Sequence, residues 1–525
     1  RQGRVNCMIL LKRTFNESMT SLKLFKIKLL QISSRTPNFK RLITSLPKAP
    51  IINGKYTTST TGETFSVKNP FDDSVLCEIP DLIVDDAIQA VNNSYEAFQS
   101  WKETTAKERS SVLKSWFHLV QKNLDYLSEL LTLEQGKPLA ESKAEVLYGA
   151  SYIEWFAEEC RRIKGEIIPS PDKSKELLVY RFPIGVVGLI TPWNFPNAML
   201  SRKAAAAIAC GCTCVAKPAE DTPLSAMALS ELAHQSGLPK GVLNVVTSSR
   251  DNSPEIGTLF CTHDKVAGIS FTGSTEVGRL LYSQCAQGVK RLSLELGSNS
   301  PFIVFESADL NKAVESVMVA KFRNMGQTCV SANKFLVQES IYEEFVSALK
   351  KAVQERFVLG NGMDSSVNQG PIVNHKQFKR IETFVGDALE KGADLVLGGL
   401  PNETRGHLYV PTIISNVKEN MLVYNEEIFG PVVSITKFKD EEEAIEKSND
   451  TKRGLAAYLF SSNLSQILRV SKALESGMVG VNEGAISMSE VPFGGVKESG
   501  FGREGSSHGV DEFTYLKYVC LGKES

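Results

Sequence analysis

The sequence predicts an α/β fold in which parallel strands alternate with helices in layers. Short apolar runs that are typical of strands alternate with segments of helical periodicity over most of the chain. The length of 525 residues exceeds what one hydrophobic core usually serves, so two or three domains are expected. The apolar content of 42% and the charged content of 23% are those of an ordinary globular protein.

The amino-terminal stretch differs from the rest in charge. Residues 1–48 contain eleven Lys or Arg and one acid, Glu17, whereas the remainder contains 48 basic and 59 acidic residues. The segment "SLKLFKIKLLQISSR" can form a basic amphipathic helix, which indicates a mitochondrial transit peptide and a matrix location. The alternatives are a disordered tail or a translation artefact, since the first methionine is Met8.

Several classes of protein are disfavoured. No apolar run approaches the roughly 18 residues of a membrane span, and no basic patch with interleaved aromatics indicates nucleic acid. Ten cysteines are too few for a disulfide scaffold, so free thiols in a reducing compartment are expected. Cys210, Cys212 and Cys214 alternate like a buried strand. Without a nearby His, and with Glu220 beyond the strand end, no metal site is predicted there.

The elements follow one another in a consistent order. "INGKY" and "NPFDDSVLCEIP" predict a hairpin, and residues 85–136 have helical periodicity. "ELLVYRFPIGVVGLITPWNFP" contains two strand-like runs, of which the second ends at a proline-bounded loop. Strands and helices then alternate from "TCVAKP" to "RLSLELG", and a second alternating block runs from "PFIVFES" to about Val481.

Three segments have residue types that suit nucleotide binding or proton transfer. "SFTGSTEVGRLL" predicts a strand, a turn from Gly273 to Gly278 and a helix, whose first N–H groups can hold a pyrophosphate. The G-x-x-x-x-G spacing alone is a weak indication. Lys217 and Glu220 follow a buried strand, either as ligands of a ribose or as a solvated loop pair. Glu295 in "LELG" is either a paired core acid or a base with a shifted pKa.

"FRNMGQTCVSAN" contains Cys329, which is either a nucleophile or a buried thiol, with Arg323 six residues before it. At this point the residues resemble a known family. "TPWNFP", "KPAEDTP", "FTGSTEVG", "LELG", "GQTCV", "EEIFGPV" and "PFGGVKESGFGRE" occur in the order and spacing of the aldehyde dehydrogenase superfamily, from about Ile51 to the C-terminus. "KFRNMGQTCV" and "AISMSEVPFGG" resemble its succinate-semialdehyde branch.

This resemblance implies an aldehyde dehydrogenase fold of three parts. They are a Rossmann-like NAD-binding domain (49–172 and 191–298), a catalytic α/β domain (299–504) and a small β arm for oligomerisation (173–190 and 505–525). A homodimer or homotetramer is implied, and no metal.

The resemblance also implies roles for individual residues. Cys329 is the nucleophile, Asn194 and the Cys329 N–H form the oxyanion hole, and Glu295 is the general base. Arg202, Arg323 and Ser487 bind the distal carboxylate of the substrate. The implied cofactor-binding residues are Trp193, Lys217, Pro218, Ala219, Glu220, Gly273, Ser274, Thr275, Glu276, Val277, Gly278, Glu427 and Phe429.

The implied reaction is NAD-dependent oxidation of succinate semialdehyde to succinate in GABA degradation, through a thiohemiacetal and a thioester on Cys329. The alternatives are a dehydrogenase of another carboxylated semialdehyde such as glutarate semialdehyde, a catalytically silent structural member, or a Cys–His hydrolase. Two positions depart from the family pattern. Ser298 stands where a second glycine is usual, and Ser331 stands where some members of the branch have a second cysteine.

Overall fold

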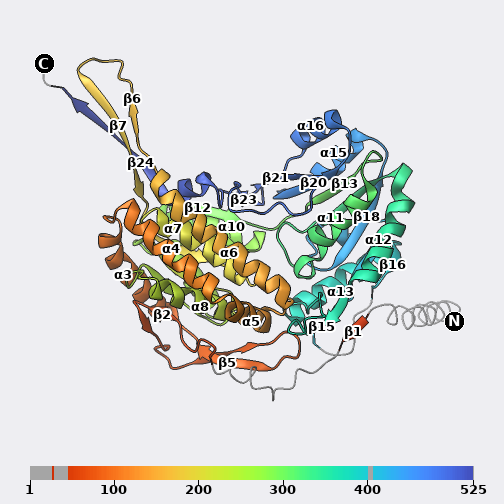
Figure 1. The fold of residues 1–525 in the computed structure, drawn as a ribbon, viewed down its shortest axis with the longest axis horizontal. Helices are drawn as coiled ribbons and strands as arrows, with labels where there is room; N and C mark the ends of the chain where they lie inside the picture. The colour runs from red at the N-terminus through yellow and green to blue at the C-terminus, as the bar shows by residue number, and fades with distance from the viewer. Residues whose placement is uncertain (1–25, 29–44, 400–405, 524–525) are drawn as a thin grey trace.

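Figure 1 presents the fold of the computed structural model, which describes residues 26–28, 45–399 and 406–523. Two α/β bodies lie next to each other, and a ribbon of antiparallel strands extends away from one of them. The predicted α/β fold with parallel sheets is confirmed. Most of the predicted targeting segment lies outside the described residues. Within it, β1 (Lys26–Lys28) pairs in parallel with β15 (Val358–Gly360).

The first body is built on a six-stranded sheet in the order β10-β9-β8-β11-β12-β23. Its first five strands are parallel, and β23 is antiparallel to β12. The strands are β8 (Val186–Ile190), β9 (Thr213–Lys217), β10 (Leu243–Val245), β11 (Val266–Thr272), β12 (Arg291–Glu295) and β23 (Gly500–Phe501).

Helices cover both faces of this sheet. One face packs against helices that share a large apolar core, namely α4 (Ala106–Lys122), α5 (Leu124–Gln135), α6 (Leu139–Glu159), α7 (Pro196–Ala209) and α8 (Pro223–Gln235). The other face packs against α3 (Val84–Trp101), α9 (Ser253–Thr262) and α10 (Thr275–Cys285). None of the helices in the described part of the chain is long and apolar enough to cross a membrane.

The register of the parallel strands determines where the site lies. Ile190 at the end of β8 is paired with Lys217 at the end of β9. Thr272 at the end of β11 is paired with Glu295 at the end of β12. The loops that follow these four strands therefore open at the same edge of the sheet, which is where ligands bind in open α/β folds.

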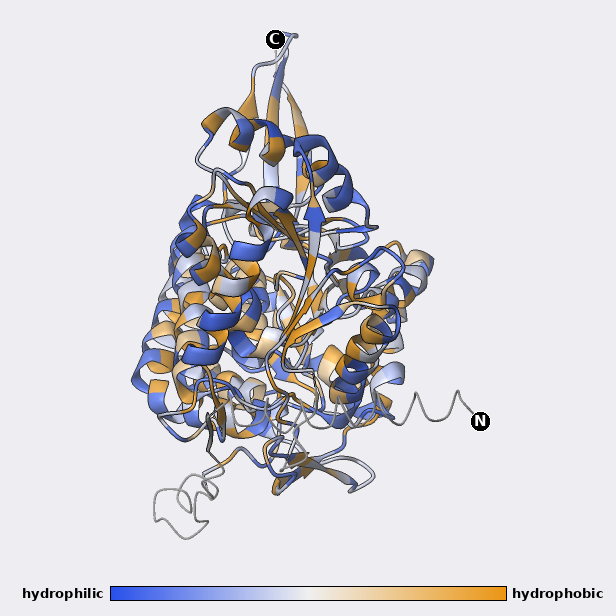
Figure 2. Ribbon diagram, turned by 90° about the vertical axis from the view of Figure 1, so that its right-hand side faces the viewer, coloured by the Kyte–Doolittle hydropathy of each residue, from blue (hydrophilic) through white to orange (hydrophobic). Residues whose placement is uncertain are grey.

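The second body is built on a seven-stranded sheet in the order β16-β17-β18-β14-β13-β20-β21. Its strands are β13 (Pro301–Val304), β14 (Lys334–Gln338), β16 (Asp394–Leu397), β17 (Thr412–Ser415), β18 (Val432–Phe438), β20 (Ala456–Phe460) and β21 (Met478–Val481). Its helices are α11 (Leu310–Phe322), α12 (Tyr342–Arg356), α13 (His375–Glu390), α14 (Leu422–Asn425), α15 (Glu441–Asn449) and α16 (Leu464–Ala473). In Figure 2 the strands between the helices are largely orange, because both faces of this sheet are covered.

The projecting ribbon consists of β6 (Glu166–Ile168), β7 (Lys175–Pro183) and β24 (Thr514–Gly522). The sheets divide the chain differently from the predicted domain boundaries at three strands. β6 falls in the predicted nucleotide range but pairs in the ribbon, whereas β8 falls in the predicted arm but pairs in the six-stranded sheet. β23 falls in the predicted catalytic range but pairs with β12. The reason is that strand pairing joins distant segments, which local patterns do not reveal.

Besides the β1–β15 pair, three short strand pairs complete the described strands. The predicted hairpin is two hairpins, of which the first joins β2 (Ile51–Ile52) to β3 (Lys55–Tyr56). The second joins β4 (Thr64–Lys68) to β5 (Val75–Pro80). Near the carboxyl end, β19 (Arg453–Gly454) pairs with β22 (Val496–Lys497).

Candidate active site

Cys329 is placed by a tight turn between α11 and β14. After Phe322 the helix stops, because Asn324, Met325 and Gly326 all have left-handed backbone angles, with φ of 51°, 57° and 71°. A side chain at Gly326 would bring its Cβ to 2.3 Å from the carbonyl oxygen of Gly430, so only glycine fits there. The turn therefore brings Cys329 back toward the edge of the six-stranded sheet.

The thiol of Cys329 lies beside the Glu295 carboxylate, within reach of a hydrogen bond. Burial, and then the neighbouring Glu295 carboxylate, raise the pKa of Cys329 well above its ordinary value, while Arg202 opposes the shift. In this arrangement the resting form of Cys329 is the thiol. A carboxylate within hydrogen-bond reach can remove the proton when an aldehyde arrives, which is the arrangement of an activated nucleophile.

Glu295 is held at the end of β12 by two neighbours. The Thr272 hydroxyl donates to its Oε2 at 3.0 Å, and Arg202 forms an ion pair with the same oxygen. Its other oxygen, Oε1, has no protein hydrogen-bond partner within the described residues. One oxygen is thus engaged and the other is available to a proton donor such as a water molecule.

Arg202 lies on α7 with only 1% of its side chain exposed. Its guanidinium is ion-paired with Glu295 and with Glu504, and it lies 4.5 Å from the centre of the Phe493 ring. The sequence interpretation assigned Arg202 to the substrate carboxylate. In this structure the guanidinium is paired with two protein carboxylates, so a substrate carboxylate could bind it only by displacing one of them. Glu504 was not among the predicted site residues, although the motif "GFGRE" contains it.

Arg323 has a different environment from Arg202. Its guanidinium lies 5.3 Å from the centre of the Phe195 ring, and it makes no ion pair with a carboxylate in the described ranges. Burial raises the pKa of the Tyr148 phenol. The charges of Arg202 and Arg323 oppose this rise, whereas Cys329 adds to it. Arg202, Arg323 and Cys329 therefore all lie near the same phenol.

The chain segment that contains Ser487 is hydrogen-bonded to Tyr152, the partner of Tyr148. Tyr148 and Tyr152 share a hydrogen bond of 2.8 Å between their hydroxyls, and Tyr152 donates to the carbonyl of Met488 at 3.0 Å. Ser487 precedes Met488 and is partly buried. The segment that contains Ser487 is thus tied to α6, although no polar contact of the Ser487 hydroxyl with the described residues defines its role.

Asn194 is fixed from both ends. Its backbone carbonyl accepts hydrogen bonds from the Lys137 ammonium at 2.7 Å and from the Asn324 amide at 2.9 Å. Its side-chain Nδ2 donates to the carbonyl of Gln327 at 3.1 Å, two residues before Cys329. An amide Nδ2 has a second proton, and this proton can form a hydrogen bond to the oxyanion of an aldehyde that is bonded to the Cys329 sulfur.

The segment after β11 fits a dinucleotide. Ser274 caps α10 by accepting from the N–H of Val277 at 3.3 Å. A Cβ at Gly278 would lie 2.4 Å from the Leu296 side chain, so glycine allows the helix to approach the sheet closely. The first N–H groups of a helix such as α10 can bind a pyrophosphate. The other predicted cofactor residues near these strand ends are Pro218, Ala219, Thr275, Glu276 and, on the exposed face of α10, Val277.

Glu220 and Lys217 lie at the end of β9. Burial lowers the pKa of Lys217, whose ammonium donates to the carbonyl of Pro218 at 3.2 Å. Glu220 has a cationic neighbour that was not predicted from the sequence: Arg250 Nε lies 3.9 Å from its Oε1. Arg250 comes from the loop after β10, the strand beside β9, so the shared sheet edge was the signal that could have identified it.

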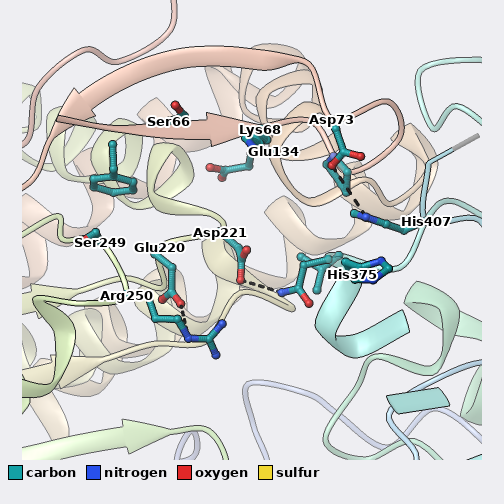
Figure 3. A pocket seen from close by; sticks show the side chains of 14 residues that line it. Ser66, Lys68, Asp73, Glu134, Glu220, Asp221, Ser249, Arg250, His375 and His407 are labelled. Carbon is teal, nitrogen blue, oxygen red and sulfur yellow. Dashed lines mark hydrogen bonds and ion pairs between the residues drawn. The ribbon is translucent and has the colours of Figure 1, made fainter. Parts of the chain in front are cut away.

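A pocket of about 390 Å³ adjoins this pair (Figure 3). Glu220 and Arg250 line it from the six-stranded body, and Asn374 and His407 line it from the other body. Asp221 bridges the two bodies by accepting from Asn374 at 3.1 Å, and burial raises the pKa of Asp221 to about 6. This pocket is distinct from the group around Cys329 and lies at the predicted adenosine end of the cofactor.

Glu427 and Phe429 come from the loop before β18. Glu427 accepts from the N–H of Ser298 at 3.1 Å, and burial raises its pKa to about 7. The Phe429 ring meets Trp193 edge-on, with 5.4 Å between the ring centres. These contacts bring the loops of both bodies together next to Asn194, which is where the sequence predicts the nicotinamide half of the cofactor.

The two departures from the family pattern have structural outcomes. The Ser298 hydroxyl shares a hydrogen bond of 2.7 Å with Ser300, so it is accommodated inside the turn after Glu295. The Ser331 hydroxyl is buried and has no protein partner in the described ranges. Position 331 therefore supplies no thiol for a disulfide with Cys329.

Comparisons with known proteins agree with this arrangement. The sequence model "Aldehyde dehydrogenase family" matches residues 56–519. The chain is 50% identical to mitochondrial succinate-semialdehyde dehydrogenase from Homo sapiens over 459 residues, which cover 87% of this chain and 86% of that protein. It is 48% identical to the NADP(+) succinate-semialdehyde dehydrogenase from Escherichia coli over 472 residues, which cover 90% and 97%.

Solved structures give the same result. Succinate-semialdehyde dehydrogenase from Burkholderia pseudomallei has a TM-score of 0.90 and 46% identity, with coverage of 93% of this chain and 100% of that chain. Betaine aldehyde dehydrogenase from Staphylococcus aureus in complex with NAD+ has a TM-score of 0.90 and 32% identity, with coverage of 93% and 97%. Fold, motif order and sequence identity lead to one conclusion: the chain belongs to the aldehyde dehydrogenase family.

Proposed function

We propose that this aldehyde dehydrogenase oxidises succinate semialdehyde to succinate with NAD. The observation that supports this substrate best is Arg323, a guanidinium beside the Cys329 group with no protein carboxylate as its partner in the described residues. A guanidinium matches a carboxylate in two parallel hydrogen bonds. Relatives about 50% identical are named for this substrate.

The first chemical step is attack of Cys329 on the aldehyde. Glu295 accepts the thiol proton, and the sulfur forms a thiohemiacetal with the carbonyl carbon. The second Nδ2 proton of Asn194 and the backbone N–H of Cys329 stabilise the oxyanion. Lys137 and Asn324 support this role, because their hydrogen bonds hold the backbone of Asn194 in place.

The second half of the reaction releases the acid. When bound, the nicotinamide of NAD would accept the hydride that the thiohemiacetal carbon gives up, which would leave the acyl group on Cys329 as a thioester. Hydrolysis then needs a base beside the thioester, and the unpartnered Oε1 of Glu295 is suited to activate water. The Thr272 hydroxyl keeps the other oxygen of Glu295 in place during this step.

Arg202 takes part by exchanging partners. Its ion pair with Glu295 restrains the base before substrate binds. A substrate carboxylate that approaches Arg323 would compete with Glu295 for the neighbouring Arg202. Because Glu504 keeps its own ion pair, Arg202 stays buried while Glu295 becomes free to act on Cys329 or water. Ser487 is proposed as a further hydrogen-bond donor to the same carboxylate.

The preference for NAD rests on Glu220. Its carboxylate can accept from both ribose hydroxyls and would repel a 2′-phosphate. Arg250 at 3.9 Å partly neutralises this charge, so the preference depends on the pair rather than on Glu220 alone. The turn at Gly273 would hold the pyrophosphate, and Glu427 with Phe429 would orient the nicotinamide half.

The assembly and location follow from the arm and the relatives. The ribbon of β6, β7 and β24 exposes Ile167 at 76%, Leu516 at 58% and Tyr518 at 60%, which favours burial against another copy of the chain. We propose a homodimer or homotetramer on this basis. Mammalian relatives are named mitochondrial, and with the basic amino-terminal segment this supports a matrix enzyme.

A substrate panel tests the proposal. NADH formation is measured with succinate semialdehyde, glutarate semialdehyde and butanal, each with NAD and with NADP. The proposal expects the highest kcat/KM for succinate semialdehyde with NAD. A higher value for butanal would refute carboxylate recognition, and a higher value for glutarate semialdehyde would reassign the substrate to a longer chain.

A further inference from the structure

The two helices behind the predicted pyrophosphate turn are joined at their far ends by a pair of thiols. Cys261 is in the last turn of α9 and Cys285 is the last residue of α10, and both are buried. The Cys261 and Cys285 thiols lie within reach of each other, and each shifts the pKa of the other. Cys261 Sγ also lies 3.7 Å from the carbonyl oxygen of Leu281, one turn before Cys285.

Further contacts fix the helix crossing. The Gln284 amide donates to the Thr258 hydroxyl at 3.1 Å, one turn before Cys261. Both hydrogen bonds join α9 to the turn of α10 that leads to Cys285, so the two helix ends are held side by side where the thiols lie. A disulfide between cysteines that already lie together needs less backbone movement than one between cysteines that point apart.

A lysine lies beside the pair. The ammonium of Lys290 donates to the carbonyls of His263 at 2.7 Å and Val266 at 2.6 Å, which fixes it next to the end of α9. The hydrogen bond from Cys261, assisted by the charge of Lys290, lowers the pKa of the Cys285 thiol. A thiol that loses its proton readily next to a cation is the reactive member of a dithiol.

Solvent can reach Cys285 by local fraying. Residues 286–289, which follow it, are all exposed. Val289 is 91% exposed and has a left-handed φ of 48°, an unfavourable conformation for a β-branched residue. A short exposed segment with such a residue opens more readily than the helix it follows.

We propose that Cys261 and Cys285 form a redox-active dithiol that hydroperoxides convert reversibly into a disulfide between α9 and α10. The Cys285 thiolate attacks the peroxide O–O bond, giving a sulfenic acid and, for hydrogen peroxide, water. The Cys261 sulfur then displaces the sulfenic oxygen, the S–S bond forms, and a second water leaves. Two thiols lose two protons and two electrons, and one hydrogen peroxide is reduced to two waters.

This site is independent of the proposed substrate, and its consequence is mechanical. Both helices begin at the sheet edge where the cofactor residues lie and end at the thiols. A disulfide would clamp the pair at its far end while Cys329, which has Ser331 rather than a cysteine nearby, stays outside the exchange. Oxidation should therefore stabilise this half of the protein against heat without joining Cys329 to another thiol.

The experiment uses full-length Cys329→Ala protein, in which the competing nucleophile is absent, treated with hydrogen peroxide. A non-reducing peptide map should contain the peptides of Cys261 and Cys285 joined together, with two free thiols lost and Tm raised, all reversed by dithiothreitol. Cys261→Ser and Cys285→Ser should each abolish the link. Absence of the joined peptide, or a link that persists in either serine variant, would overturn the proposal.

Lys290→Gln tests the activating cation. The rate of disulfide formation should fall by at least about three-fold, because the thiolate fraction of Cys285 falls. The matched control is Lys265→Gln, since Lys265 donates to Asn92 at 2.6 Å instead of serving the dithiol end. Equal rates in both variants would refute the role of Lys290. If a serine variant does not fold, the peptide map of the Cys329→Ala protein decides alone.

Discussion

The guanidinium of Arg202 forms a buried ion pair with the Glu295 carboxylate and holds Glu504 on its other side. The proposed base is therefore restrained by a residue that the sequence assigned to substrate binding. Arg323 lies nearby without such a partner in the described part of the chain. This difference separates the two arginines: Arg202 is paired within the protein, whereas Arg323 has no such ion pair and is the proposed ligand of the substrate carboxylate.

The first prediction contrasts the stability of two variants. Arg202→Leu leaves Glu295 and Glu504 buried with less compensation, and breaking a buried pair in this way costs about 3–5 kcal/mol. Arg323→Leu removes no ion pair of the described structure and should change stability by less than about 1 kcal/mol. Thermal unfolding of both variants checks this. Equal losses in Tm would contradict the distinct roles.

The second prediction concerns Glu295→Gln. The amide can still accept the Thr272 hydroxyl bond, but it cannot take a proton from water. Pre-steady-state kinetics should therefore give a slowed burst of NADH, because Glu295 also takes the Cys329 proton, followed by little turnover, because the thioester accumulates. A burst at the wild-type rate would contradict the role of Glu295 toward the Cys329 thiol, and a steady-state rate as high as that of the burst would contradict its role toward water.

The third prediction concerns cofactor choice. Glu220→Gln removes the charge that opposes a 2′-phosphate and frees Arg250, its neighbour at 3.9 Å. A hydrogen bond to a charged group contributes roughly 1.5–3 kcal/mol, so the NADP/NAD ratio of kcat/KM should rise at least about ten-fold. Glu220→Gln combined with Arg250→Gln is the control and should lose most of this gain. An unchanged ratio in the single variant would rule out this role for Glu220.

The fourth prediction concerns pH. Burial raises the pKa of Glu427 from 4.5 to about 7. The folded state then binds more protons than the unfolded state, so the stability that Glu427 contributes is full below pH 4.5 and is lost as pH rises through 7. Between pH 5.5 and pH 8, roughly the range of this titration, the Tm of Glu427→Gln should therefore fall less than the Tm of the wild type.

The control for the pH experiment is the adjacent Glu426. Its side chain is 46% exposed and pairs with Arg453 at 3.3 Å, so water already solvates its charge. Glu426→Gln should therefore keep the wild-type dependence of Tm on pH. If both variants behave like the wild type, Glu427 is not the source of the effect.

The parts of the fold that sequence predicted well are those with local patterns. Strand–turn–helix order, the Gly273–Gly278 turn and the strand ends at Lys217 and Glu295 follow from hydrophobic periodicity and turn residues. Pairing between distant segments does not. The placement of β8 in the six-stranded sheet and of β23 beside β12 depends on contacts over many residues.

The candidate site shows the same limit. Family motifs pointed to Cys329 as the candidate nucleophile. They did not reveal the partners of Arg202, because Glu295 lies 93 residues further along the chain and Glu504 lies further still. Arg250 was missed because its relation to Glu220 depends on the neighbouring strand β10. Charge pairing is a property of the folded chain, and local sequence cannot tell which of two arginines is already neutralised.

Arg323 is the residue proposed to select a substrate with a distal carboxylate. Loss of its guanidinium should remove charged hydrogen bonds worth roughly 1.5–3 kcal/mol each, on the order of ten- to a hundred-fold in kcat/KM. Butanal has the same four carbons as succinate semialdehyde and lacks the carboxylate, so it reports on any general damage to the site.

The decisive measurement is the ratio of kcat/KM for succinate semialdehyde to kcat/KM for butanal, in the wild type and in Arg323→Leu. We expect the ratio to fall at least about ten-fold in the variant, with butanal turnover largely retained. An unchanged ratio, with both substrates slowed alike, would show that Arg323 is structural and would rule out its role in carboxylate recognition.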